Sequence, residues 1–228
     1  MTSKCDLPAG AGCHTLAKSM IQAFLLMFEG GPAWDRIVLK EQGFATVFFK
    51  HLMPMMLITT TLEGLGLAHW GKWQPALKFY RPFPPNVALA YEVGNFTLNL
   101  LMILICARLV QVLGRTFHGR ITYTYAHSFS AVVYGLSPMF LARLFDPFAG
   151  MSPYVTWVVG ILLSIWVLYD GLPRLLAPDP THAFGYYISS AIMLFMATGL
   201  VRGVTAMYLQ SNVDLTHTFI GHILPQVH

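Results

Sequence analysis

The sequence predicts an all-α, polytopic membrane protein with five transmembrane helices, preceded by one or two amphipathic helices at the membrane interface. Of its 228 residues, 55% are hydrophobic and only 11% are charged. A soluble domain carries roughly 25% charged residues, so this chain could not cover its surface in water. The apolar residues also gather in five stretches, each close to the ~20 residues that cross a bilayer. These observations exclude a water-soluble enzyme and a disordered chain.

Two short amphipathic helices are expected in the N-terminal segment, residues 1–43. Between Thr15 and Phe28, polar residues fall on one helical face and apolar residues on the other. This pattern is typical of a helix that lies flat at the membrane interface. A second helix is expected to begin at Pro32, since proline suits the first helical turn, and to end at Gly43. The alternative is that both are cytoplasmic helices packed against the spans.

The transmembrane domain is predicted at residues 44–209, followed by an extracytoplasmic tail at 210–228. Proline-rich turns separate the spans, and Pro54 and Pro138 inside spans predict helix kinks. The predicted spans are Phe48–Leu67, Val87–Leu113, Tyr123–Phe145, Tyr154–Leu175 and Ala183–Leu209.

The positive charges predict the orientation. If the N-terminus is cytoplasmic, nine of the 14 Lys and Arg residues fall inside and five fall outside. Cytoplasmic loops carry the excess of positive charge, so the N-terminus is expected inside and the C-terminus outside. We expect this membrane to be the bacterial cytoplasmic membrane.

Charged residues inside the spans are the main candidate site. They are Glu63, Glu92, Arg108, Asp170 and Arg202. Such residues pair with one another or line a functional path, so both ion pairs that hold the bundle and a proton or ion route are open interpretations. At about 1.5 Å per residue, Glu63, Glu92 and Arg202 share one level, roughly 7–10 Å below the outer boundary. We therefore predict that Arg202 contacts Glu63 or Glu92, and that Arg108 approaches Asp170 in the inner half.

Other residue patterns are weaker candidates. Gly199 and Gly203 have the spacing of small residues at a helix–helix contact. His51 and His127 could hold a b-type haem between helices, although histidines bonded to backbone or water are the plainer interpretation. The chain has no Gly-x-Ser-x-Gly motif and no Gly-rich phosphate loop. We expect no enzymatic activity, no metal site, no cofactor apart from lipid, and no nucleic-acid partner, because the basic residues are scattered.

Three short motifs resemble the Yip1 domain family. Gly31–Ile37 resembles the Pro-x-Trp-x-x-Ile entry of its prokaryotic members, and Tyr125–Leu141 resembles its third span, with a proline late in the helix. Trp166–Leu172 resembles its fourth span, which ends in an aromatic residue followed by Gly-Leu. The resemblance covers Gly31–Leu209 and implies five spans with a cytoplasmic N-terminus. The GTPase binding of eukaryotic members is not expected, because their Asp-Leu-Tyr-Gly-Pro segment has only Phe28–Pro32 as a counterpart.

The sequence therefore predicts a non-enzymatic membrane protein, either an accessory or scaffolding subunit of a larger complex or an organiser of the membrane. Its expected partners are lipids and other integral membrane proteins. Two alternatives remain: a small transporter or channel that uses the intramembrane carboxylates, and a haem- or quinone-binding subunit of a redox complex.

Overall fold

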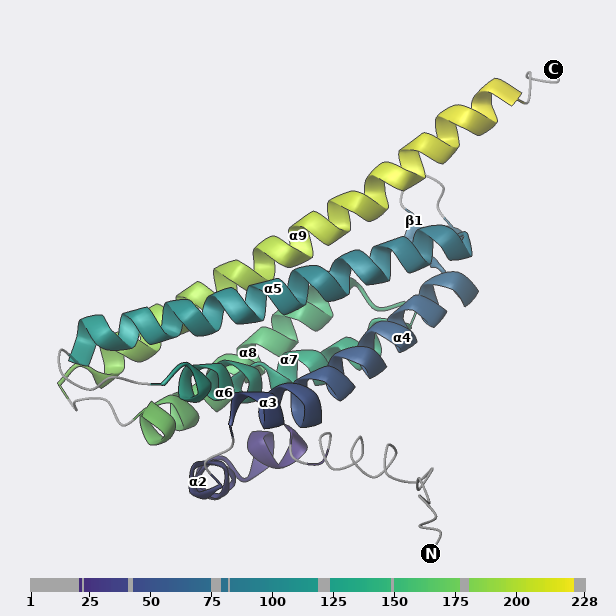
Figure 1. Ribbon diagram of the computed structural model, residues 1–228. Helices are drawn as coiled ribbons and strands as arrows, with labels where there is room; N and C mark the ends of the chain where they lie inside the picture. The colour runs from purple at the N-terminus through teal and green to yellow at the C-terminus, as the bar shows by residue number, and fades with distance from the viewer. Residues whose placement is uncertain are drawn as a thin grey trace, which may run out of the picture.

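The computed structural model describes residues 21, 23–40, 43–74, 79–81, 83–118, 124–148, 150–176 and 181–223. In this part of the chain, five helical segments are long and apolar enough to cross a membrane (Figure 1). Each overlaps one predicted span, with ends that differ by no more than four residues and a fifth span that is identical, so the prediction of five spans is confirmed. The segments are Phe44–His69, Pro85–Thr116, Tyr125–Phe145, Tyr154–Leu176 and Ala183–Leu209.

The first span is interrupted by a π-helical turn. It consists of α3 (Phe44–Val47), the π turn η1 (Phe48–Leu52) and α4 (Met53–His69). Pro54 lacks the N–H that would bond the carbonyl of Lys50, and its ring crowds that carbonyl. The widened turn lies directly before Pro54 and relieves this conflict. The irregularity predicted at Pro54 is thus a π turn.

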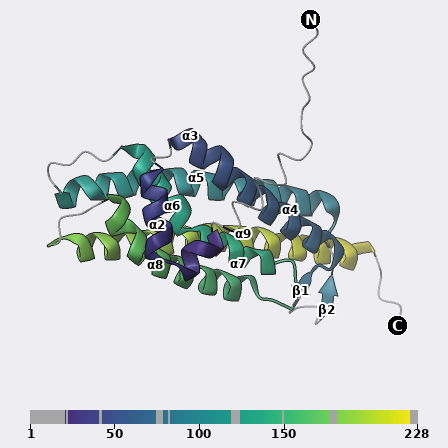
Figure 2. The same cartoon turned by 90° about the horizontal axis from the view of Figure 1, so that it is seen from below.

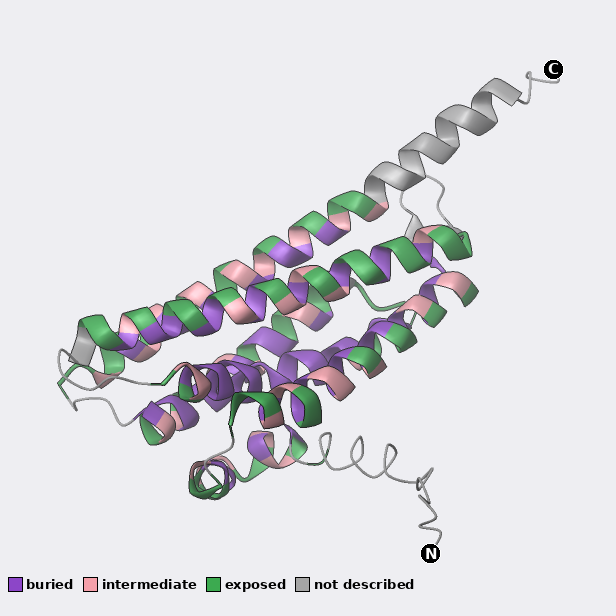
Figure 3. Ribbon diagram, viewed as in Figure 1, coloured by how far each residue is buried: buried purple, intermediate pink, exposed green. Residues whose placement is uncertain are grey.

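The third span is broken near Pro138, as predicted. One residue separates helix α6 (Tyr125–Gly135) from α7 (Ser137–Ala142), and the 3-10 turn η2 (Arg143–Phe145) follows. This span is the central one: 89% of its most apolar stretch is buried, against 28% for the fifth span (Figure 3). The other spans surround it and leave their outer faces to the lipid.

Two long helices lie side by side along one flank of the bundle. They are α5 (Pro85–His118) and α9 (Ala183–Ile223), and the shorter α8 (Pro153–Leu176) lies between the central span and α9 (Figure 1). With 34 residues, α5 is about 50 Å long at ~1.5 Å per residue. A hydrocarbon core is about 30 Å thick, so α5 must tilt or extend beyond it.

A small β-hairpin joins α4 to α5 and was not predicted. Strand β1 (Lys72–Gln74) pairs antiparallel with β2 (Phe79–Arg81), with Trp73 opposite Tyr80 (Figure 2). Gly71 makes the turn out of α4 with a φ of 68°, a backbone conformation that a residue with a side chain rarely adopts. Strands of three residues are too short for an alternating pattern to predict them.

The N-terminal helix α2 (Gly31–Leu39) packs against α8. The Trp34 ring is fully buried there because Gly171 leaves room for it: a Cβ on Gly171 would lie 2.1 Å from the ring. Arg174 Nη1 forms an ion pair with Asp35 Oδ1 at 2.8 Å. The helix expected from Pro32 is therefore present and packs against a span, but it ends at Leu39 and not at Gly43 as expected.

Residues 21 and 23–28 are helical, whereas the earlier part of the expected interfacial helix lies outside the described residues. Ala23 and Leu26 are buried, while Phe24 and Phe28 stack on each other with exposed rings. The outward-facing aromatic rings suit a helix whose outer face contacts lipid.

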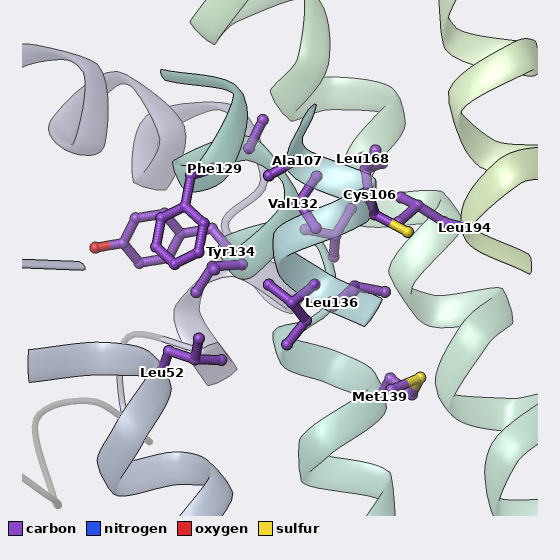
Figure 4. Close-up of a cluster of buried hydrophobic side chains, with 14 of the residues drawn as sticks. Leu52, Cys106, Ala107, Phe129, Val132, Tyr134, Leu136, Met139, Leu168 and Leu194 are labelled. Atoms are coloured by element: carbon purple, nitrogen blue, oxygen red, sulfur yellow. The ribbon is translucent and has the colours of Figure 1, made fainter. Parts of the chain in front are cut away.

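All five spans contribute to one apolar core (Figure 4). The break in the central span places Leu136 and Met139 beside residues of its neighbours, and Tyr134 meets the Trp34 ring edge-on at 6.3 Å between centroids. The labelled members are Leu52, Cys106, Ala107, Phe129, Val132, Tyr134, Leu136, Met139, Leu168 and Leu194.

Candidate functional site

Four charged side chains meet inside the bundle near its hairpin end and form what we call the ion cluster. Glu63 comes from α4, Arg143 and Asp146 from the end of the third span, and Arg202 from α9. Their exposed fractions are 1%, 4%, 0% and 7%. With two positive and two negative groups, the ion cluster is formally neutral, which a low-dielectric interior requires.

The ion cluster is held by short contacts. Arg143 Nη2 lies 2.6 Å from Glu63 Oε2, and Arg202 Nη2 lies 2.5 Å from Asp146 Oδ2. Arg202 Nη1 also approaches Glu63 Oε1 at 3.6 Å, so each carboxylate faces two guanidinium groups. Removing any one charge would leave a buried opposite charge without compensation.

Polar residues of the remaining spans complete the ion cluster. From α5, the Tyr91 hydroxyl donates to Glu63 Oε1 at 3.1 Å, and Asn95 Nδ2 lies 3.5 Å from Glu63 Oε2. From α8, the Thr156 hydroxyl donates to Asp146. One connected network of polar contacts therefore joins all five spans.

The expected contact between Arg202 and Glu63 is present, so counting depth along the helices selected a real neighbour. Arg143 and Asp146 were missed: Arg143 lies in the last residues of the predicted span Tyr123–Phe145, and Asp146 directly follows that span beside Pro147. The available signal was their i, i+3 spacing, which places opposite charges together at a helix end.

Glu92, the other expected partner of Arg202, lies outside the ion cluster. Its exposed fraction is 8%, and both carboxyl oxygens are buried without a hydrogen-bond partner among the described residues. Gly64 on α4 leaves room for it, since a Cβ there would lie 2.9 Å from Glu92 Cγ.

The expected pairing of Arg108 with Asp170 is wrong. Arg108 is exposed and donates to Gln111 one turn along α5, while the Asp170 carboxylate lies beside the backbone of Gly30. No ion pair joins the two among the described residues. Arg108 is exposed and Asp170 is only partly buried, so neither charge requires a partner inside the bundle.

The two histidines of the haem hypothesis are in different environments. His51 is buried in the π turn, where Nε2 lies 2.9 Å from the Ser137 hydroxyl and the ring packs on Tyr134. His127 is exposed on α6, ten residues before Ser137, or about 15 Å along a helix. The two histidines therefore lie in different surroundings, His51 in the core and His127 on the surface.

The two glycines of the expected helix contact also differ. A Cβ at Gly199 would lie 3.1 Å from the Trp157 ring, so this glycine does permit close packing of α9 on α8. A Cβ at Gly203 would meet nothing within 4 Å. The small-residue pattern therefore predicted one contact correctly and one wrongly, because only the first position faces a neighbouring helix.

Beside the ion cluster lies a cavity of about 20 Å³, bordered by Asn95, Asn99 and both arginines. This is room for about one water molecule. No group of three or more His, Cys, Asp or Glu side chains that could hold a metal occurs among the described residues. The arrangement can fix helices and bury charge, but it offers little space for a substrate.

Five apolar spans tied together by a buried, neutral ion cluster define the molecule as a polytopic α-helical membrane protein. The chain belongs to the Yip1 domain family, whose sequence profile matches residues 24–201, as the three motifs had indicated. No curated protein and no solved structure matches the chain.

Proposed function

We propose that this protein is a non-enzymatic membrane organiser, a rigid bundle that sets the arrangement of lipids and membrane proteins around it. The observation that carries the proposal is the network that joins all five spans through Glu63, Asp146 and their arginines. Intramembrane charges used in this way stabilise one arrangement of the helices. The Yip1 family is a family of membrane proteins and is not a known enzyme family, which agrees with this role.

The lengths of the helices suggest how the bundle acts on a bilayer. The central span has 21 residues, about 32 Å of helix, whereas the lipid-facing second span has 32 residues, about 48 Å. Lipids next to the bundle therefore meet helices longer than a typical 30 Å core, which favours tilt or a locally thicker bilayer. Large apolar side chains cover these outer faces, among them Leu101 and Ile105 on α5 and Met196 and Leu200 on α9.

The transporter alternative has less support. Glu63 and Asp146 are both occupied by arginines, and the cavity beside them holds about one water. A transport pathway needs carboxylates that can exchange partners along a continuous polar route.

Phase-separated giant vesicles made from short- and long-chain phosphatidylcholines test the proposal. The fluorescently labelled protein is expected to enrich in the thicker phase. Arg202→Met, which breaks the ion cluster, should lower this enrichment, whereas Arg36→Met removes only an exposed ion pair with Glu29 and should leave it unchanged.

A proton-sensitive dye sealed inside small vesicles provides the opposing readout. We expect vesicles that contain the protein to hold a pH gradient as well as protein-free vesicles do. Equal partitioning between the two phases, together with a proton flux that Glu92→Gln abolishes, would identify a transporter and overturn the proposal.

A further inference from the structure

A groove on the side of the bundle runs between α4 and α5 and has a volume of about 440 Å³. Small-molecule sites commonly enclose about 300–1,000 Å³, so this groove is large enough for a ligand. It extends from Ala68 and Pro85 near the hairpin to Leu57 and Phe96 deeper in the bundle. Its walls are mostly apolar, and Leu65 and Leu89 on its rim are exposed to the lipid.

The Glu92 carboxyl is the distinctive group in this groove. The residue exposes only 8% of its surface, and neither carboxyl oxygen has a hydrogen-bond partner among the described residues. The hydroxyls of Thr60 and Thr61, which also line the groove, donate to carbonyls of their own helix and are not available to it. A buried acceptor left without a donor is rare in folded proteins and requires an explanation.

The Glu92 side chain lies directly against α4 because Gly64 has no side chain. Any Cβ at that position would lie 2.9 Å from Glu92 Cγ, inside normal contact distance. Glu63, one residue earlier, is in contrast surrounded by Tyr91 and two arginines. The two acids near the hairpin thus differ: Glu63 is paired within the ion cluster, whereas Glu92 lines an apolar groove.

The depth and lining of the groove identify the chemistry of its occupant. Glu92 lies seven residues after Pro85, about 10 Å along α5 from the start of the helix. A charged phospholipid headgroup stays at the boundary, and none of the described residues that line the groove is basic and could neutralise a phosphate. A hydroxyl, however, can enter to this depth and donate a hydrogen bond to a carboxyl.

We propose that the groove binds an uncharged lipid whose polar head is a hydroxyl, such as a diacylglycerol. Its chain lies between α4 and α5, against Phe96, and its hydroxyl donates to Glu92. This inference deepens the proposed function by naming a class of lipid. It rests on that function only for its biological meaning, because the binding experiment does not depend on membrane thickness.

The test is photolabelling of the full chain in nanodiscs with a diazirine-bearing diacylglycerol, followed by mass spectrometry of the labelled peptides. We expect label on α4 and α5 around Gly64 and Glu92, displaced by unlabelled diacylglycerol. Glu92→Leu should weaken labelling about tenfold, the effect of losing one good hydrogen bond. Glu92→Gln keeps an acceptor and should retain most of it.

Two matched variants, Gly64→Leu and Gly94→Leu, test whether the shape of the groove matters for binding. The first fills the groove, whereas Gly94 is on α5 with nothing within 4 Å of an added Cβ and is not part of the lining. Only Gly64→Leu should abolish labelling, with both variants eluting as the wild type does on size exclusion.

Three outcomes would overturn the proposal. Label spread evenly over the lipid-facing helices and unchanged in Glu92→Leu would mean nonspecific contact. Equal displacement by phosphatidylcholine would remove the preference for a hydroxyl head. A disulfide-linked dimer formed by a Leu89→Cys variant would assign the groove to a second copy of the chain. None of these results bears on whether the bundle partitions into thicker membranes, so the two proposals fail separately.

Discussion

The two ends of the bundle use charge in different ways. Near the hairpin, Glu63, Arg143, Asp146 and Arg202 are buried at the centre and neutralise one another. At the opposite end, Arg108 is exposed on α5, and Arg174 is half-exposed and binds Asp35 of α2. The four charges of the ion cluster point into the bundle and are paired there, whereas Arg108 and Arg174 are exposed and need no buried partner. At that second end, α2 is held against α8 by the close packing of Trp34 on Gly171.

The largest effect is expected from breaking the ion cluster. Arg202→Met leaves Asp146 and Glu63 with one guanidinium between them and should lower the free energy of unfolding by about 3–5 kcal/mol. Unfolding by denaturing detergent added to mild-detergent micelles measures it. The double variant Arg202→Met with Asp146→Asn should be less destabilised than Arg202→Met, since no lone charge remains. A double variant less stable than the single one would contradict electrostatic compensation.

A smaller effect is expected from packing at the other end. Gly171→Ala places a methyl group within the Trp34 ring and should displace α2 from α8, at a cost of about 1–3 kcal/mol. Faster proteolysis within α2 and a shift of tryptophan fluorescence would report this displacement. Gly94→Ala adds the same methyl group to α5 in open space and serves as the control. If both variants resist protease equally, the close packing of α2 on α8 is not required.

Charges at the second end should contribute least to stability. Arg174→Gln removes an ion pair whose side chains are 42% and 59% exposed, and Arg108→Gln removes a contact with Gln111. Each change should alter the free energy of unfolding by less than about 1 kcal/mol, because exposed pairs are solvated. The same detergent titration measures them. A loss as large as that of Arg202→Met would erase the distinction between the two ends.

The orientation prediction assigns each end to a side of the membrane and involves no change in stability. In a background without the native cysteines, Lys78→Cys should react with an impermeant maleimide added to intact cells, and Gly119→Cys only after the cells are opened. Both positions lie outside the described residues. The reverse pattern would place the hairpin end, with its ion cluster, in the cytoplasmic leaflet.

Composition and the five apolar stretches determined that this chain is a membrane protein of five spans, because lipid tolerates few charges and requires about 20 apolar residues per crossing. Pro54 and Pro138 likewise marked both helix irregularities, since a missing N–H acts locally. The contact between Glu63 and Arg202 also followed from counting residues along their helices, because helix rise is fixed.

Only the tertiary structure decided which way each side chain points around its helix axis. That rotation separates Glu63, which meets Arg143 and Arg202, from Glu92, which faces the groove at a similar depth. It likewise turns Asp146 into the bundle toward Arg202 and separates Arg108 from Asp170. The sequence reports position along a helix, whereas rotation and partner are set by how all five helices pack together, which depends on contacts between residues far apart in the chain.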